Sequence, residues 1–382
     1  MEPDFFIARY AEIGVKGGNR SYFEKLLLRN VRTALRGQEC DDVSLSFSKV
    51  LVKLRRGAGV AEAGRRLGRV FGVENFSPTY SCRTEYPQME KAVLEAAKRS
   101  GGAKTFRITT NRSWKGFPAT SQELNVKLGS SVSGLGLKAK MTGADVNIEV
   151  DVMKERTLVF TERFPGPGGL PAGSGGRVVC LLSGGIDSPV ASWMMMRRGC
   201  HPIFAHFYNE NLGSPTKVRE LAGTLCRSQP PAKLWLIPFA ECQKAIIGRA
   251  PSEYRMLLYR RMMFRIAEAI ARQEKAKALV TGDSLGQVSS QTLENMTAVE
   301  AAVAMSVFRP LVGMDKMEIT RMAESIGTYA TSIRQYQDCC SFMTPRHPAT
   351  KSDPFQLERA ESGLPLQRLA DDAMDRAQSL NI

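Results

Sequence analysis

A six-residue segment, Ser183-Gly184-Gly185-Ile186-Asp187-Ser188, places the strongest limit on how this chain can fold. It follows directly after an apolar run at 178–182, which is typical of a buried strand, and a helical pattern begins where it ends. The two glycines let the backbone approach an anion, the serine hydroxyls donate hydrogen bonds, and the helix N-terminus adds partial positive charge. The segment therefore predicts a strand-loop-helix unit that holds a pyrophosphate group.

Other phosphate-binding loops do not fit this sequence. The chain has no Gly-Lys dipeptide, which excludes a Walker A loop, and no G-x-G-x-x-G pattern for a dinucleotide. Asp187 is a candidate ligand for Mg²⁺ at the phosphates, because carboxylate oxygens are the ligands that this ion prefers. The alternative is a glycine-rich turn in which Asp187 only caps the helix.

The sequence after residue 176 alternates between strand and helix patterns. We expect strands at 177–182, 202–207, 233–238 and 277–281, and helices at 188–198, 215–227, 253–273 and 315–326. This alternation predicts a doubly wound parallel sheet with helices on both faces, and ligands of such sheets bind at the carboxyl ends of the strands. Residues 177–382 are therefore expected to form the domain that carries the loop.

The first half of the chain predicts two smaller domains, so that the fold class of the whole is α/β. Residues 1–75 give patterns in the order β-α-β-β-α-β, which is typical of a ferredoxin-like domain. Residues 76–165 predict a second α/β unit, with helices at 87–100 and 120–133. Nine of the twelve residues at 165–176 are Gly or Pro, so we expect a linker at 166–176.

Positive charge is concentrated in the first half. The chain has a formal charge of +15, and residues 49–140 contain 18 Lys and Arg against 6 Asp and Glu. Such an excess favours a polyanion, because each neutralised phosphate releases a condensed counterion. A basic surface kept for solubility is the alternative. If nucleic acid binds here, we expect the contacts to come from cations near Trp114 and Phe117, namely Lys104, Arg107, Arg112, Lys115, Lys138 and Lys140.

The segment at 183–188 resembles the PP-loop of ATP pyrophosphatases, which split ATP into AMP and pyrophosphate to adenylate a substrate oxygen. Four further motifs stand beside it: 280–293 (VTGDSLGQVSSQTL), Arg260-Arg261-Met262-Met263, Arg309-Pro310-Leu311 followed by Asp315-Lys316, and Asp338-Cys339. With these motifs the chain resembles the tRNA 4-thiouridine synthetases, and the resemblance covers essentially its whole length. Upstream, 168–173 (GGLPAG) and the basic unit look like the end of a THUMP domain, an RNA-binding module. Many family members add a C-terminal rhodanese domain that carries sulfur, and we expect this chain to be a short form without one.

The resemblance implies an ATP-dependent tRNA sulfurtransferase that converts a uridine, at position 8, to 4-thiouridine. Adenylation turns the uridine oxygen into AMP, a good leaving group that sulfur can replace. By the same resemblance Asp187, through Mg²⁺, and Lys316 serve adenylation, and Cys339 serves sulfur transfer. The residues implied to contact ATP are Leu181, Leu182, Ser183, Gly184, Gly185, Ser188, His206, Phe207, Arg260, Gly282 and Gln291.

The implied partners are tRNA and a cysteine desulfurase that supplies persulfide sulfur, and a homodimer is left open. Other PP-loop reactions on RNA, such as 2-thiolation or lysidine formation, and a non-catalytic RNA-binding protein are the alternatives. Sulfur supply for thiamine thiazole synthesis is a further role found in the family. From the residues alone, Lys316 and Arg260 are equally compatible with solvated surface cations.

The eight cysteines contain no C-x-x-C pair and are too sparse for a disulfide scaffold, which favours a reducing cytoplasm. The missing C-x-x-C also gives no support for the iron–sulfur cluster that some relatives without rhodanese are thought to bind. No run of about 18 apolar residues occurs, so we expect no membrane-spanning segment. Four cysteines in apolar or helical settings are expected to be buried and inert: Cys180, Cys200, Cys226 and Cys242.

Overall fold

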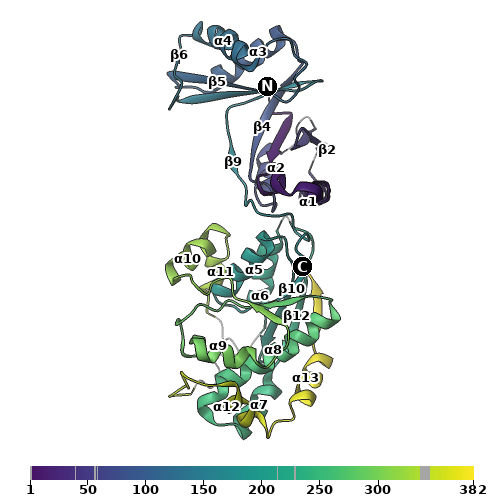
Figure 1. Cartoon of the computed structure of the whole chain (residues 1–382), viewed down its shortest axis with the longest axis vertical. Helices are drawn as coiled ribbons and strands as arrows, with labels where there is room; N and C mark the ends of the chain where they lie inside the picture. Colours follow the sequence, from purple (N-terminus) through teal and green to yellow (C-terminus); the bar gives the residue numbers. More distant parts are fainter. Residues whose placement is uncertain are drawn as a thin grey trace. The chain divides into compact units, whose positions relative to one another are not determined.

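The computed structural model of the chain describes residues 2–38, 40–55, 57, 59–212, 214–227, 229–335 and 345–382. It divides into two compact units, residues 1–169 and 170–382 (Figure 1). Among the described residues, no helix is both long and apolar enough to cross a membrane.

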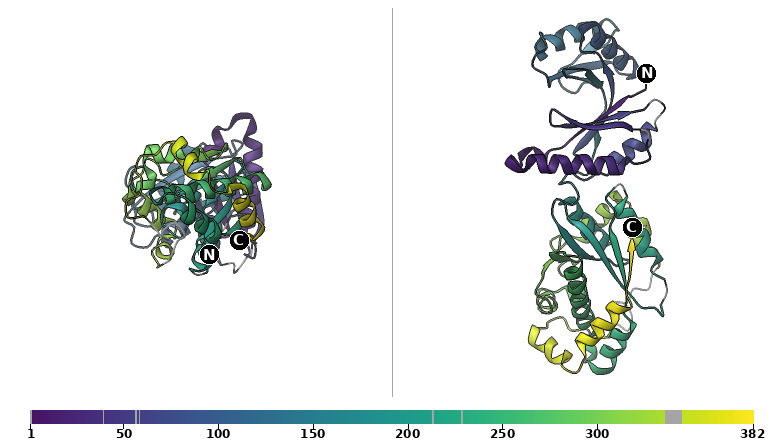
Figure 2. Two further views of the ribbon diagram at one scale, coloured as in Figure 1. Left: turned by 90° about the horizontal axis from the view of Figure 1, so that it is seen from below. Right: turned by 90° about the vertical axis from the view of Figure 1, so that its right-hand side faces the viewer.

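The first half of unit 1 has the predicted β-α-β-β-α-β order. A two-residue turn joins β2 to β3, with Phe47 and Ser48 both at positive φ, as a tight hairpin of this kind requires. Leu27 and Val31 of one helix and Leu67 of the other are buried against the strands, so both helices cover one face of the sheet (Figure 2). The elements are β1 (Phe5–Arg9), α1 (Arg20–Ala34), β2 (Cys40–Ser46), β3 (Lys49–Leu54), α2 (Val60–Leu67) and β4 (Asn75–Cys82).

The second half of unit 1 is the basic α/β unit. A capping box between Thr120 and Glu123 starts its second helix, which explains why that helix begins where the sequence predicts it. Its strands extend the first sheet, which runs in the order β2-β3-β1-β4-β8-β7-β5-β6 with β9 beside β4. The elements are α3 (Tyr86–Arg99), β5 (Thr105–Arg112), α4 (Ser121–Ser133), β6 (Lys138–Ala139), β7 (Val146–Val152), β8 (Thr157–Phe160) and β9 (Phe164–Pro165).

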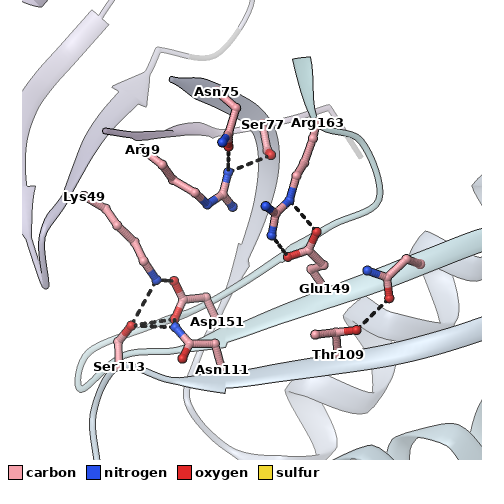
Figure 3. Close-up of polar contacts among 11 residues, drawn as sticks. Arg9, Lys49, Asn75, Ser77, Thr109, Asn111, Ser113, Glu149, Asp151 and Arg163 are labelled. Carbon is pink, nitrogen blue, oxygen red and sulfur yellow. Dashed lines mark hydrogen bonds and ion pairs between the residues drawn. The ribbon is translucent and has the colours of Figure 1, made fainter. Parts of the chain in front are cut away.

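A polar network joins the two halves of unit 1, and we call it the junction network (Figure 3). Lys49 of β3 forms an ion pair with Asp151 of β7, whose other oxygen accepts hydrogen bonds from Ser113 (2.7 Å) and Asn111 (3.1 Å). Beside these four residues an apolar cluster contains side chains from both halves: Phe5, Ile7, Leu51, Met153, Leu158 and Phe160.

Unit 2 is a six-stranded sheet with helices on both faces. Its strand order is β14-β13-β10-β11-β12-β15, parallel except for the last pair. Alternate residues such as Val179 and Ile203 pack in the same core as the long helix α8, whereas Cys180 and Phe204 are buried on the opposite face. The strands are β10 (Arg177–Leu181), β11 (His201–Tyr208), β12 (Lys233–Pro238), β13 (Ala278–Val280), β14 (Ser306–Phe308) and β15 (Gln378–Asn381).

The predicted α/β fold class is confirmed, with a β-α-β-β-α-β unit, a second α/β unit and a doubly wound sheet. The long predicted helix at 253–273 is a short 3-10 turn at Ser252–Tyr254 followed by α8, and the short strands β14 and β15 were not anticipated. The helices are α5 (Asp187–Arg197), α6 (Thr216–Cys226), α7 (Ala240–Arg249), α8 (Arg255–Gln273), α9 (Leu293–Glu300), α10 (Lys316–Ser325), α11 (Tyr329–Ser332), α12 (Pro354–Glu361) and α13 (Leu366–Asp375).

The Gly/Pro-rich stretch at 165–176 is hydrogen-bonded within each unit rather than free along its length. Gly166 and Gly168 donate to the carbonyls of Glu74 and Val73, and Gly173 donates to the carbonyl of Gly199. A Cβ at Gly166 would lie 2.2 Å from the Val73 oxygen, so this close approach needs glycine.

Candidate active site

The candidate site lies where the strand order of unit 2 reverses direction. From β10 the chain proceeds to β11 and β12 on one side, and β13 and β14 lie on the other. The segment at 183–188 connects the carboxyl end of β10 to α5, at this switch point. A ligand cavity is expected at such a position, and one of about 300 Å³ is found there.

The loop at 183–188 is held in shape by its own hydroxyl groups. The Ser183 amide donates to Ser188 Oγ at 2.8 Å, the two serine oxygens are 3.0 Å apart, and the Gly185 amide donates to Ser183 Oγ at 3.2 Å. His206 of β11 lies at the base of the loop, with Nδ1 2.8 Å from the Leu182 carbonyl. The serines therefore order the backbone that would surround a phosphate group.

Asp187 and Lys316 meet although 129 residues separate them. Lys316 Nζ is 2.6 Å from Asp187 Oδ1, and Gln287 Nε2 donates to Asp187 Oδ2 at 2.9 Å. Lys316 is the first residue of α10, whose start is fixed by a capping box between Asp315 and Glu318. A carboxylate and an ammonium group are thus placed together at the mouth of the cavity.

Gly282 allows β13 to approach the start of α5. A Cβ at this position would lie 2.7 Å from the Ser188 amide nitrogen and 2.8 Å from the Ser188 Cα. Both atoms are backbone, so a larger residue here requires the loop itself to move. This glycine shapes the wall of the site through its missing side chain.

Arg260 and Gln291 converge on a buried carboxylate. Both oxygens of Asp283 lie 2.6 Å from Arg260 Nη2, and Gln291 Nε2 is 3.3 Å from Oδ1. Burial alone would raise the pKa of Asp283, but Arg260, Thr281 and Arg309 outweigh it and lower that pKa below its ordinary value. The carboxylate is therefore held in its charged form beside the cavity.

The cavity also has an apolar wall, of which the sequence analysis identified only Phe207. Met256, Met263 and Phe264 of α8 line it together with Phe207 of β11. Met256, Arg260, Met263 and Phe264 occupy positions i, i+4, i+7 and i+8 of α8, so their helical spacing could have revealed one shared face. An aromatic and aliphatic wall suits the flat, weakly polar surface of a nucleobase.

The structure thus collects most of the predicted ATP residues around one cavity. Gly184 and Gly185 belong to the same loop but do not line the cavity. Lys316 does not line it either, but it contacts Asp187, which does. The predicted residues that line the cavity are Leu181, Leu182, Ser183, Asp187, Ser188, His206, Phe207, Arg260, Gly282 and Gln291.

The side chains at the cavity suit a metal ion that is bound mainly by the phosphates of a nucleotide and only in part by the protein. Among the described residues, no group of three or more His, Cys, Asp or Glu side chains is arranged to hold a metal ion. Mg²⁺ in nucleotide sites is bound by one or two carboxylates and completes its shell with phosphate oxygens and water. Asp187, in the loop at 183–188, fits that role as a single carboxylate.

The predicted RNA-binding cations fall into two groups within unit 1. Lys104, Lys138 and Lys140 are exposed where β6 pairs with β5, and Arg107 is exposed on β5. Arg112, by contrast, donates through Nη1 to the carbonyls of Phe117 (2.9 Å) and Ala119 (2.7 Å), which stabilises the loop that contains the exposed Lys115.

Cys339 and Cys340 lie outside the described residues. Of the six described cysteines, Cys180, Cys200, Cys226 and Cys242 are buried, as predicted. Burial raises the pKa of all six thiols, to about 12 in Cys82, Cys180, Cys226 and Cys242. A thiol with so high a pKa carries little thiolate at neutral pH and is a poor nucleophile.

Models of three protein families match the chain. The ferredoxin-like domain of ThiI proteins matches residues 5–77, the THUMP domain matches residues 83–162, and the thiamine biosynthesis protein ThiI matches residues 173–366. Together they cover both units.

Similar proteins span the same length. The chain is 46% identical over 97% of its length to a probable tRNA sulfurtransferase of Thermus thermophilus, covering 91% of that protein. It is 41% identical over 98% of its length to a probable tRNA sulfurtransferase of Moorella thermoacetica, covering 97% of it. A crystal structure of a 4-thiouridine synthetase in complex with RNA and with bound ATP superposes with a TM-score of 0.91, at 35% identity and with full coverage of both chains.

Proposed function

The chain belongs to the ThiI family of tRNA sulfurtransferases, and we propose that it uses the cavity at the loop 183–188 to adenylate a tRNA uridine before thiolation. The family membership makes it an ATP-dependent tRNA-thiolating enzyme. The observation that best supports the proposed site is the pairing of Asp187 with Lys316 beside that loop. By family resemblance the target is the uridine at position 8 and the product is 4-thiouridine.

In the proposed reaction the triphosphate of ATP lies over the loop and its base lies against the apolar wall. The uridine O4 attacks the α-phosphorus, the bond to the β-phosphate oxygen breaks, and pyrophosphate leaves. Backbone amides of the loop and the ammonium group of Lys316 stabilise the charge that develops on the phosphates. Mg²⁺, when bound at Asp187, neutralises phosphate charge and orients the leaving group.

We propose that Cys339 then serves in the transfer of sulfur to the adenylated uridine. A persulfide sulfur, derived from a cysteine desulfurase, attacks C4, and the C4–O bond breaks to release AMP. A second thiol cleaves the remaining S–S bond and leaves the new sulfur on C4 as the thione. Cys340, which follows Cys339 directly, is the candidate for that thiol. The described cysteines are poor candidates, because burial raises the pKa of each of them.

The alternatives make different products. A 2-thiolating enzyme would place sulfur on C2, and a lysidine-forming enzyme would join lysine to a cytidine, so neither yields 4-thiouridine. A non-catalytic RNA-binding protein would release no pyrophosphate. A role in sulfur supply for thiamine synthesis would need sulfur transfer to a protein acceptor instead of tRNA.

The test incubates the full chain with unmodified tRNA, ATP, Mg²⁺ and either sulfide or a cysteine desulfurase with cysteine. We expect pyrophosphate release and the near-ultraviolet absorbance of 4-thiouridine. Asp187→Ala should abolish both while tRNA binding is retained, because the basic surface belongs to unit 1. Cys339→Ser should retain pyrophosphate release and lose thiolation with the desulfurase donor. Modification at another base, or none with either donor, would overturn the proposal.

A further inference from the structure

Asp283 is a buried carboxylate in the cavity wall to which the proposed reaction gives no role. It directly follows Gly282, lines the cavity and is 4% exposed. A buried carboxylate is costly unless its oxygens are paired, so its partners show what it does.

Four side chains from separate parts of unit 2 converge on Asp283. Arg260 comes from α8, Thr281 from the end of β13, Gln291 from the 3-10 turn at Ser289–Gln291, and Arg309 follows β14. Thr281 Oγ1 donates to Oδ2 at 2.8 Å, and Arg309 Nε is within ion-pair distance of the same oxygen at 3.4 Å. Asp283 therefore connects the two side chains implied to contact ATP, Arg260 and Gln291, to each other and to the sheet.

The contact with Gln291 fixes which end of its amide faces the carboxylate. A charged carboxylate only accepts hydrogen bonds, so the NH₂ group must point to Asp283 and the carbonyl oxygen must point away. Gln291 is 8% exposed and lines the cavity, and its Oε1 has no hydrogen-bond partner among the described residues. An acceptor buried without a partner is unfavourable until a ligand supplies a donor.

We propose that Asp283 is a positioning residue that presents Gln291 Oε1 as a hydrogen-bond acceptor to the nucleotide and holds Arg260 in place beside it. The donor is an N–H or O–H group of ATP, either the 6-amino group of the base or a ribose hydroxyl. This inference rests on the proposed function only in taking the cavity as the ATP site. It explains how a site built from an apolar wall can select one nucleotide.

The test measures nucleotide binding by the full chain without tRNA or sulfur donor, so that it does not depend on thiolation. ATP is compared with ITP, which has an oxygen in place of the 6-amino group, and with 2′-deoxy-ATP and 3′-deoxy-ATP. We expect the loss of one of these donors to weaken wild-type binding about ten-fold, the effect of leaving one buried acceptor unpaired. In Asp283→Asn the amide of Gln291 can turn over, so we expect that discrimination to fall below about three-fold and ATP binding itself to weaken.

Two further variants separate positioning from folding. Gln291→Met leaves Asp283 and Arg260 in place, and it should lose the discrimination while ATP binding weakens less than in Asp283→Asn. Glu300→Gln is the matched control, because Glu300 pairs with the other side of Arg309 and its loss changes the charge by the same amount. Its nucleotide profile should equal that of the wild type.

The outcomes distinguish the two proposals. Unchanged discrimination in Asp283→Asn or in Gln291→Met, or no discrimination by the wild type, overturns the positioning role and leaves the proposed function intact. A wild-type chain that binds neither ATP nor any analogue overturns the proposed site.

Discussion

Replacing Asp151 by Asn removes the carboxylate at the centre of the junction network (Figure 3). The Asp151 side chain is 3% exposed and that of its partner Lys49 is 17% exposed, so the ion pair is largely shielded from water. Asn keeps the size of the side chain and one acceptor oxygen for Ser113 or Asn111. It leaves Lys49 without a counter-charge between the two halves of unit 1.

The expected loss of stability follows from these contacts. Removing one partner of a buried ion pair costs about 3–5 kcal/mol, and the partial exposure of Lys49 places this pair near the lower end, about 3 kcal/mol. For a unit of this size, 1 kcal/mol corresponds to about 2–4 °C in the unfolding midpoint. We therefore expect the unit 1 transition of Asp151→Asn to fall by about 6–12 °C.

Scanning calorimetry of the full chain, with hydrogen exchange to assign each transition to its unit, measures this shift. Asp41→Asn is the matched control, because it makes the same charge change in the same sheet, where Asp41 pairs with the exposed Lys53 and Arg55. Exposed pairs contribute about 0–1 kcal/mol, so its midpoint should move by less than about 4 °C. Equal shifts in both variants would refute the assignment of the junction network as a buried link between the halves.

Three other outcomes follow from the structure. Gly282→Ala should raise the KM for ATP at least about ten-fold in a pyrophosphate-release assay, because its Cβ would meet the Ser188 backbone, whereas Gly223→Ala, with open space at its Cβ, should not. Glu361→Gln should lower the free energy of unfolding by about 3 kcal/mol at pH 7, since its arginine partners, the half-buried Arg265 and the buried Arg261, outweigh burial and lower the Glu361 pKa. A carboxylate whose pKa is lowered by folding contributes stability above the ordinary Glu pKa, and this contribution is lost as the pH falls through the pKa of the folded state. The difference between the two proteins in denaturant titrations should therefore shrink as the pH falls below the ordinary Glu value. Iodoacetamide at pH 8 should modify Cys339 and Cys340 well before the six cysteines whose pKa is raised, as peptide mass spectrometry would show.

The parts of the fold that the sequence predicted are those set by local patterns. The loop at 183–188 follows from six adjacent residues, and the parallel sheet follows from regular alternation of apolar runs with helical spacing. β14 has three residues and β15 has four, and they form because the edges of an existing sheet offer them hydrogen bonds. No periodic signal in the sequence marks such edge strands.

The residues of the site that belong to sequence motifs were predictable, whereas the contacts among residues from separate elements were not. Asp283 belongs to a quoted motif, yet three of its four partners come from positions 8 to 26 residues away on separate elements, so only the fold shows that they meet. Arg112 was grouped with RNA-binding cations by charge, but its guanidinium stabilises a loop through two carbonyls. Charge alone does not distinguish a cationic side chain that is available to bind a ligand from one that is hydrogen-bonded within the protein.

Lys316 shows how the conflict between a local rule and a fold can point to function. The N-terminus of a helix carries partial positive charge, so a cation in the first turn is unfavourable by about 0.3–1 kcal/mol. The capping box of Asp315 and Glu318 stabilises the start of α10 without any help from Lys316, which is 47% exposed at its side chain. The helix itself therefore gains nothing from a lysine at this position. The contact that accounts for the lysine is the one with Asp187, at 2.6 Å, in the loop at 183–188. Local rules are expected to fail where a residue serves a site instead of its own helix. The contact with Asp187 therefore supports the proposed role of Lys316 in adenylation.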